Sequence, residues 1–467
     1  MNKQAMVVTV FVSLLFFFMA GYLLHFILVD SPEIISNNGN ELADSKTIDL
    51  VRGTIYSSNG KKLAYTDTKG TEKDLDDDER IYPYGKTFAH VVGITTHGKM
   101  GLEKSCNYDL LNNEATPMQK IVDDFSGTKE RGSDVHTTLS VKMQRAAYNC
   151  LGSHKGAVFV MKPSSGKILA MTSKPSYNPN TIDKIWEKLA NDSKDSRLVN
   201  RATQGKYIPG SVFKIVTTLE YMREKSGYNN FSYTCYGSAK FGGFKIACFD
   251  GKAHYTEDLD GAFAYSCNSA FSTIGTKLNV SKFRNTAEQL LFNSKLPLDI
   301  ESSKSDFVLA KGAKEFDIAQ TSIGQGKTTV SPAHMAMIAS AIANKGVLMK
   351  PYIVDSVINS YDIMVKATEK EEYKRLMSAK EARRLKQYMR SVCRYGTARN
   401  MAYSSYTAYG KTGTAELDKD DDINSWFVGF AKKGKKKVVV AVCLEDIKQG
   451  SDTAVNCAKQ LFDTYFS

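Results

Sequence analysis

Proline is scarce in this sequence, and the short motifs that most often mark metal and nucleotide sites are missing. Only 10 prolines occur in 467 residues, beside 33 glycines, which excludes a collagen-like or proline-rich fibrous chain. No C-x-x-C pair occurs, so zinc and dithiol redox sites are not expected, and no other pattern implies a metal or an organic cofactor. The phosphate loop G-x-x-x-x-G-K and aromatic-basic motifs are also absent, so we predict no nucleic-acid partner.

The residues that are present are typical of a globular chain with a basic surface. Hydrophobic residues make up 42% of the sequence and charged residues 24%, as in ordinary folded domains. A length of 467 residues suggests two or three such domains. The formal net charge of +12 comes without a nucleic-acid motif, so we expect the basic surface to meet anionic lipid and wall polymer.

One long apolar segment stands near the N-terminus. Ala5 to Val29 spans 25 residues without Asp, Glu, Lys or Arg, which is long enough to cross a hydrocarbon core of roughly 30 Å. A cleavable signal peptide has a shorter apolar region of about 7–15 residues, so we predict an uncleaved anchor in the lipid bilayer. Lys3 precedes the segment and Asp30 follows it, which favours a cytoplasmic N-terminus and an extracellular remainder.

Three regions follow one another along the chain. Residues 1–30 hold the cytoplasmic tail and the anchor, residues 31–134 are polar and rich in turns, and a second composition runs from 135 to 467. In the middle region, Ser58-Asn59-Gly60-Lys61 predicts a hairpin turn between short strands. We therefore expect a small α+β accessory domain between the anchor and the main domain.

Sequence patterns that predict β-strands lie at both ends of the main domain. Apolar runs predict strands over Gly156–Met161, Lys167–Met171, Trp426–Phe430 and Val438–Leu444. Helical spacing of apolar residues predicts helices over Ser140–Leu151 and Asp452–Tyr465. Strands from both ends with a helical interior predict an α+β fold, in which an antiparallel sheet is flanked by helices.

Eight cysteines are present, and the positions of two of them suggest a disulfide. They are Cys106, Cys150, Cys235, Cys248, Cys267, Cys393, Cys443 and Cys457. Cys235 and Cys248 lie in a glycine-rich stretch, where a disulfide would close a short loop and contribute up to about 3 kcal/mol. Two free thiols are the alternative, because an extracellular site permits oxidation without requiring it. Cys443 and Cys457 have the apolar surroundings of ordinary core residues.

The strongest local signal is Ile208-Pro209-Gly210-Ser211-Val212-Phe213-Lys214. Pro209 and Gly210 end the preceding segment, so Ser211 stands at a helix start and Lys214 projects from the same face. A serine hydroxyl becomes a good nucleophile when a neutral amine takes its proton. Lowering a lysine pKa from about 10.4 to about 7 requires burial or a second cation nearby. The motif therefore predicts a desolvated site with another lysine close by.

A second motif, Tyr265-Ser266-Cys267-Asn268-Ser269, lies 55 residues further along the chain. Ser266 offers a hydroxyl that can relay a proton between a lysine and a leaving group. Asn268 offers a side chain that can hold a substrate amide. Taken alone, the same residues also fit a simple helix cap.

A third motif, Gly410-Lys411-Thr412-Gly413-Thr414-Ala415-Glu416, supplies the remaining groups. Lys411 is the second cation that the first motif requires, and the hydroxyls of Thr412 and Thr414 can receive a carboxylate. Gly413 lets a bound peptide approach the backbone at the rim of a sheet. Taken alone, this motif also fits a plain strand end.

In the order S-x-x-K, S-x-N and K-T-G, the three motifs resemble the signature of penicillin-binding proteins and serine β-lactamases. The likeness runs from about Ser133 to the end of the chain. Similar segments outside the three motifs are Lys174–Pro179, Ile323–Gly326, Gly396–Ala398 and Trp426–Phe430. The stretch from Arg52 to Glu103 resembles the class B, monofunctional branch.

This resemblance implies a transpeptidase/β-lactamase-like fold with an all-α subdomain beside the sheet, behind an accessory domain of the pedestal or dimerisation type. It implies a D,D-transpeptidase whose Ser211 is acylated by peptidoglycan stem peptides and by β-lactams, with the backbone amides of Ser211 and Thr414 as the oxyanion hole. Class B members usually work beside a polytopic membrane glycosyltransferase, which is therefore the expected protein partner.

Three alternatives share this fold. A D,D-carboxypeptidase would pass the acyl group to water, and a β-lactamase would deacylate quickly. Class A β-lactamases place a glutamate in an E-x-x-x-N context, whereas the sequence around Glu301 reads Glu-Ser-Ser-Lys-Ser. A non-catalytic wall-binding or β-lactam-sensing membrane protein is the alternative from another functional class.

Overall fold

The computed structural model describes residues 3–26, 50–68, 78–113, 130–192, 195–416, 422–448 and 454–467. Helix α1 (Lys3–His25) matches the predicted anchor, and Met6–His25 is long and apolar enough to cross a membrane. Its large side chains are exposed, with Phe16, Phe17 and Phe18 at 67%, 77% and 78%. A helix that exposes so many apolar side chains has the surface expected of a lipid-facing segment.

The main domain is built on a five-stranded antiparallel sheet that joins the two ends of the domain, as predicted. Its strand order is β17 (Thr407–Glu416), β18 (Asp422–Lys433), β19 (Lys436–Lys448), β7 (Gly156–Met161) and β8 (Ile168–Lys174). Strand β19 pairs with β7 through Val439↔Met161 to Leu444↔Gly156. The central strands are buried along nearly their whole length because helices cover the sheet.

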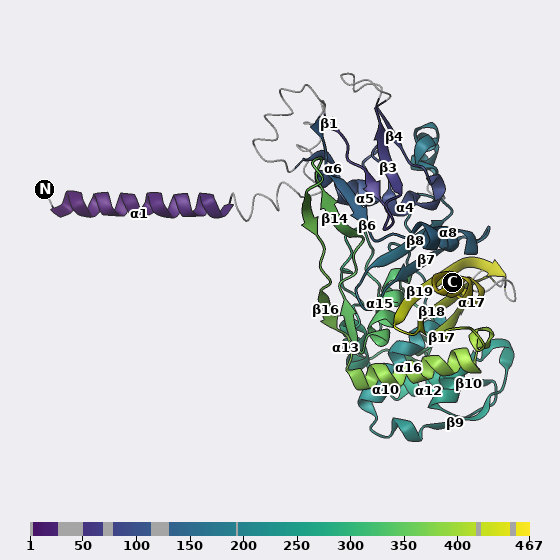
Figure 1. The fold of residues 1–467 in the computed structure, drawn as a ribbon. Coiled ribbons are helices and arrows are strands. Elements are labelled where there is room, and N and C mark those ends of the chain that lie inside the picture. The colour runs from purple at the N-terminus through teal and green to yellow at the C-terminus, as the bar shows by residue number, and fades with distance from the viewer. Residues whose placement is uncertain are drawn as a thin grey trace.

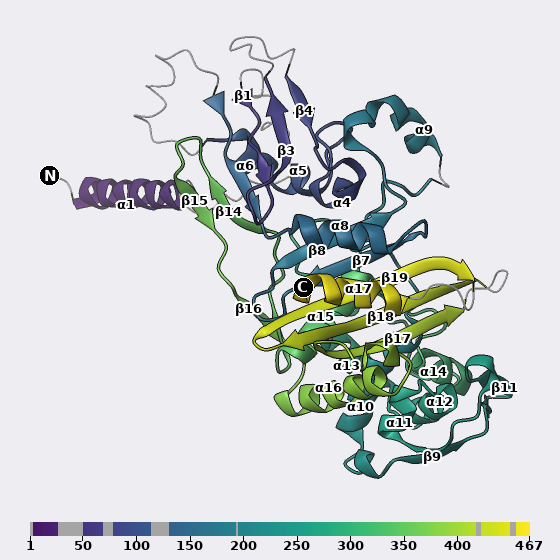
Figure 2. The same ribbon diagram turned by 45° about the vertical axis from the view of Figure 1, so that its right-hand side comes forward.

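Helices from distant parts of the sequence cover the sheet. Figure 2 shows α17 (Ala454–Phe466) in front of the sheet and α15 (Pro332–Ala343) behind it. Helix α8 (Val141–Cys150) packs against α17 and β8, and α16 (Ala379–Arg394) packs against β17. Every residue of α15 is buried, so this helix is a central part of the hydrophobic core.

A mostly helical subdomain lies below the sheet in Figure 1. Its helices are α10 (Lys214–Glu224), α11 (Leu259–Ala264), α12 (Asn268–Thr276), α13 (Val280–Gln289) and α14 (Glu315–Ser322). The expected all-α subdomain also contains two small antiparallel sheets, which pair β9 (Ser232–Cys235) with β12 (Tyr255–Asp258) and β10 (Ser238–Phe241) with β11 (Phe244–Ala247). Gly242 and Gly243 adopt positive φ angles of 53° and 86° in the β10–β11 turn, which only glycine adopts without strain.

A second, six-stranded sheet lies on the N-terminal side of the main domain (Figure 1). Its order is β15 (Met364–Ala367), β14 (Val354–Ile358), β6 (Asp134–Thr137), β2 (Ile55–Tyr56), β3 (Lys62–Asp67) and β4 (Glu79–Ile81). Strands β2 and β3 are antiparallel around the predicted Ser58–Lys61 turn. The sheet combines early strands with β14 and β15, so long-range pairing ties the accessory region to the main domain.

Short elements complete the fold. They are β1 (Leu50–Val51), β5 (Glu130–Arg131), β13 (Val347–Met349), β16 (Glu372–Arg375), α4 (Ala89–Val92), α5 (Gly101–Ser105), α6 (Asn107–Leu111), α9 (Trp186–Asn191), and the 3-10 helices η3 (Gly85–Thr87), η4 (Pro179–Thr181), η5 (Asp183–Ile185), η6 (Gly210–Phe213), η7 (Tyr228–Asn230), η8 (Phe249–Gly251) and η9 (Arg399–Met401).

A buried carboxylate organises the accessory region. Glu103 on α5 has no exposed side-chain surface, and it accepts hydrogen bonds from Arg52 Nε at 2.6 Å and from Arg80 Nε at 2.9 Å. Burial alone would raise the pKa of this carboxyl, but the two guanidinium groups outweigh burial and hold the pKa below its usual range. The ionised carboxylate therefore joins two segments that precede it in the chain.

Replacing Glu103→Gln should lower the free energy of unfolding by about 3–5 kcal/mol, because two buried guanidinium groups would lose their counter-charge. Denaturant titration of the full-length protein in detergent measures the change. The matched control is Glu301→Gln, since Glu301 is exposed and pairs with Lys104 at the surface; it should change stability by less than about 1 kcal/mol. Equal effects of the two substitutions would contradict a structural role for the buried network.

Candidate active site

Ser211 lies in the tight turn η6, which leads directly into α10. Gly210 has φ 53°, and a Cβ at this position would lie 2.6 Å from the Thr414 carbonyl oxygen. The absence of a side chain at Gly210 therefore lets the turn lie against β17. Ser211 is half-buried, whereas Lys214, the first residue of α10, is fully buried.

The ammonium group of Lys214 is held by the second motif. Its Nζ donates to the Ser266 carbonyl oxygen at 2.7 Å, to Ser266 Oγ at 3.2 Å and to Asn268 Oδ1 at 2.7 Å. Ser266 adopts φ 61°, a left-handed conformation that costs a non-glycine residue about 1–2 kcal/mol. This conformation presents both oxygens of Ser266 to the same lysine. Burial lowers the pKa of Lys214 to about 8.

Lys411 on β17 completes the cluster. Its Nζ donates to Ser266 Oγ at 2.8 Å and to the Thr412 carbonyl oxygen at 3.1 Å. Burial, and then the nearby charge of Lys214, lower the pKa of Lys411 well below the usual range. Ser266 Oγ thus bridges two buried amines, so the structure brings Lys214, Ser266 and Lys411 into one hydrogen-bonded cluster, as the motifs predicted.

Both polar atoms of the Asn268 side chain form hydrogen bonds within the chain. Its Oδ1 accepts from Lys214, and its Nδ2 donates to the Ala247 carbonyl oxygen at 2.9 Å. In this structure Asn268 therefore orients Lys214 and links the motif to the end of β11. The predicted contact with a substrate amide would require one of these bonds to open.

The remaining K-T-G residues line the adjacent rim of β17. Thr412 Oγ1 lies 2.6 Å from Thr397 Oγ1. A Cβ on Gly413 would lie 3.0 Å from the Pro209 carbonyl oxygen and 3.1 Å from a Val212 methyl group. Gly413 thus permits close packing between β17 and the turn that carries Ser211.

Three residues that support this arrangement had no role assigned from the sequence. Trp426 on β18 donates from Nε1 to the Ile208 carbonyl oxygen at 3.1 Å, and the Gly210 amide donates to the Gly324 carbonyl oxygen at 2.9 Å. Thr397 is the hydroxyl partner of Thr412. All three lie in segments that resemble the penicillin-binding family, which was the available signal, but only the folded chain shows what they contact.

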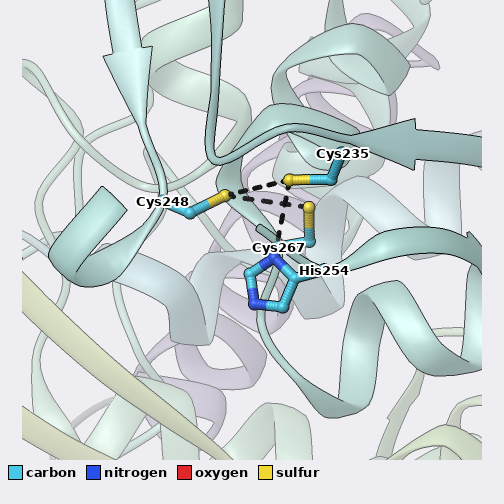
Figure 3. Close-up of side chains that lie close together, drawn as sticks. All are labelled: Cys235, Cys248, His254 and Cys267. Atoms are coloured by element: carbon cyan, nitrogen blue, oxygen red, sulfur yellow. Dashed lines mark hydrogen bonds between the residues drawn. The ribbon is translucent and has the colours of Figure 1, made fainter. Parts of the chain in front are cut away.

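The cysteines depart from the sequence prediction. Cys235 and Cys248 are free, and their sulfurs lie 3.6 Å apart without a covalent bond. Both sulfurs face a shared space with Cys267 and His254 (Figure 3). The disulfide instead joins Cys150 and Cys457, which connects α8 to α17, so Cys457 is not an ordinary core residue.

Two known domain families match the sequence. The penicillin binding protein transpeptidase domain matches residues 156–463, and the penicillin binding protein A dimerisation domain matches residues 52–135. The peptidoglycan D,D-transpeptidase PbpA of Mycolicibacterium smegmatis is 31% identical over 427 residues, which cover 85% of this chain and 84% of that protein.

Solved structures agree with this match along nearly the whole chain. Penicillin-binding protein A from M. tuberculosis, in a penicillin G acyl-enzyme complex, is 28% identical with a TM-score of 0.79, covering 89% of this chain and 100% of that one. A D,D-transpeptidase domain from Eggerthella lenta is 29% identical with a TM-score of 0.78, covering 90% of this chain and 98% of that one. With residues of the three motifs assembled around the Ser266 hydroxyl, this chain belongs to the penicillin-binding protein transpeptidase family, in its class B branch.

Proposed function

We propose that this protein is a membrane-anchored D,D-transpeptidase that cross-links peptidoglycan stem peptides through an acyl-enzyme on Ser211. The observation that carries the proposal is the Ser266 hydroxyl, which bridges the buried amines of Lys214 and Lys411. Because burial lowers the pKa of Lys214 to about 8, about a tenth of the amine is neutral at pH 7 and can accept a proton. Such a base, three residues from an accessible serine, is the arrangement that serine acyl transfer requires.

Acylation begins when neutral Lys214 takes the proton of Ser211. Ser211 Oγ then attacks the penultimate D-alanyl carbonyl of the donor stem peptide, and the backbone amides of Ser211 and Thr414 stabilise the oxyanion. Collapse of the tetrahedral intermediate expels D-alanine, whose amine receives a proton through the Ser266 hydroxyl. An amine from a second stem peptide then takes the acyl group and releases Ser211.

Recognition of the donor uses the rim of β17. Lys411, Thr412 and Thr414 would receive the terminal carboxylate of the donor. A β-lactam presents an equivalent carboxylate and a strained amide, so it would acylate the same serine.

The same proposal places the chain at the cell envelope. Residues 1–30 are a cytoplasmic tail and a single-pass anchor, residues 31–134 are the accessory, dimerisation-like domain, and residues 135–467 are the extracellular transpeptidase domain. The exposed apolar surface of α1, and Lys3 ahead of the apolar span Met6–His25, support this topology. The expected protein partner is a polytopic membrane glycosyltransferase that supplies uncross-linked glycan strands.

Ser211→Ala should abolish the penicillin adduct, because no other residue would then carry the nucleophile. Intact-mass spectrometry of the full-length protein after brief exposure to penicillin measures the adduct, and peptide mapping locates it. Ser164→Ala, at an exposed turn, is the matched control and should acylate normally. With a stem-peptide donor and acceptor, a cross-linked dimer would support transpeptidation, whereas D-alanine release without a dimer would indicate a carboxypeptidase. An adduct that persists in Ser211→Ala would refute the proposal.

The acylation rate should rise with pH and level off near pH 8, because Lys214 acts as a base only when neutral and its pKa is about 8. Below that value, each pH unit should reduce the second-order rate constant about tenfold. Stopped-flow measurements with a chromogenic β-lactam give the profile. Lys214→Arg serves as the comparison, since a guanidinium stays protonated, and it should lose at least about 100-fold in rate. A wild-type profile that is flat between pH 6 and pH 9 would contradict Lys214 as the base.

A further inference from the structure

Four side chains with metal-binding chemistry gather beside the second motif (Figure 3). Cys235 ends β9, Cys248 precedes η8, His254 precedes β12, and Cys267 is the N-cap of α12. The three cysteines are buried, and His254 is half-buried at the edge of the group. Four separate backbone segments therefore direct one ligand atom each toward the same point.

The spacing of these atoms matches a tetrahedral zinc ion. The Cys235 and Cys248 sulfurs are 3.6 Å apart, the Cys248 and Cys267 sulfurs are 3.8 Å apart, and Cys235 Sγ is 3.6 Å from His254 Nδ1. All four ligand atoms lie within 4.8 Å of one another. Zn–S bonds of about 2.3 Å in a tetrahedron separate two sulfurs by about 3.8 Å, so little movement is needed to admit the ion.

We propose that Cys235, Cys248, His254 and Cys267 bind one structural zinc ion. Thiolates are soft ligands that select zinc over magnesium, calcium or manganese, and a Cys₃His set fills all four tetrahedral positions. A closed set of this kind holds loops together and leaves no position for substrate. Of the four ligands, only His254 is not fully buried.

The absence of a C-x-x-C pair does not exclude this site. In the chain, Cys248 lies 13 positions after Cys235, and Cys267 lies 19 positions after Cys248. Pairing of β9 with β12, through Cys235↔Tyr255, brings the first and third ligands together. Because the two small sheets of the helical subdomain create the site, its ligands do not show the spacing of a zinc knuckle.

The zinc site adjoins the candidate active site through the backbone. Cys267 stands between Ser266 and Asn268, which together supply the three acceptors of Lys214. Asn268 also bonds to the Ala247 carbonyl, one residue before Cys248. If Ser211 chemistry is as proposed above, zinc at Cys267 is a positioning element that fixes the Lys214 acceptors without touching the substrate.

Metal content of the full-length protein in detergent tests the site directly. Inductively coupled plasma mass spectrometry should find about one zinc per chain, and Cys235→Ser should reduce it at least about tenfold. The matched control is Cys106→Ala, which alters a buried free cysteine of the accessory region and should retain zinc. Less than about a tenth of a zinc per wild-type chain after incubation with zinc would overturn the proposal, as would a Cys235–Cys248 disulfide in a non-reduced peptide map.

Two measurements on the wild-type chain keep the test independent of whether the variant folds. Cobalt(II) exchanged into the protein should show the visible absorption and the thiolate charge-transfer band of a tetrahedral sulfur site; an octahedral spectrum would overturn the proposal. Chelation should expose Cys235, Cys248 and Cys267 to alkylation, whereas equal alkylation before and after chelation would count against zinc.

The rate of penicillin acylation tests whether zinc positions the acceptors of Lys214. Chelation should slow penicillin acylation by about 10–100-fold, and added zinc should restore the rate. Unchanged acylation of the zinc-depleted protein would overturn the positioning role. Zinc content does not depend on acylation, so a chain that binds zinc but forms no penicillin adduct would refute the proposed function and leave the zinc site standing.

Discussion

Two buried lysines share a single hydroxyl, and the rest of the molecule is arranged around that contact. Lys214 and Lys411 both donate to Ser266 Oγ, and both side chains are fully buried. Burial lowers the pKa of both amines, and the charge of Lys214 lowers the pKa of Lys411 further. The protein must therefore hold α10, β17 and the turn before α12 in fixed relative positions. A shift in any of them would admit water and restore the ordinary basicity of the two amines.

These positions depend on backbone contacts that leave no room for a side chain. Gly210 lies against the Thr414 carbonyl, and a Cβ on Gly324 would lie 2.0 Å from the Gly210 carbonyl oxygen. Trp426 ties the segment before Ser211 to β18 through its indole nitrogen. The Ser211 turn is thus enclosed by backbone on two sides, which preorganises it before any substrate arrives. The proposed zinc site, which includes Cys267 between Ser266 and Asn268, would similarly fix the position of the second motif.

Much of the fold and most of the candidate site could be predicted because their signals are local. Apolar runs located β7, β8 and the cores of β18 and β19, and the S-x-x-K motif located the helix start that carries Ser211 and Lys214. Other features have no local signal. The Cys150–Cys457 bond, the pairing of β14 with β6 and the grouping of Cys235 with His254 each join segments whose approach depends on the packing of the whole domain.

The sequence by itself determined the N-terminal apolar helix, the α+β class and the identity of the three motifs, because periodicity, length and motif order are properties of the chain alone. Only the tertiary structure decided that Asn268 holds Lys214, that Cys235 and Cys248 stay unbonded, and that four ligands face one point. Such features require distances between atoms far apart in sequence, and those distances are set when helices and sheets pack together, not by any residue's immediate neighbours.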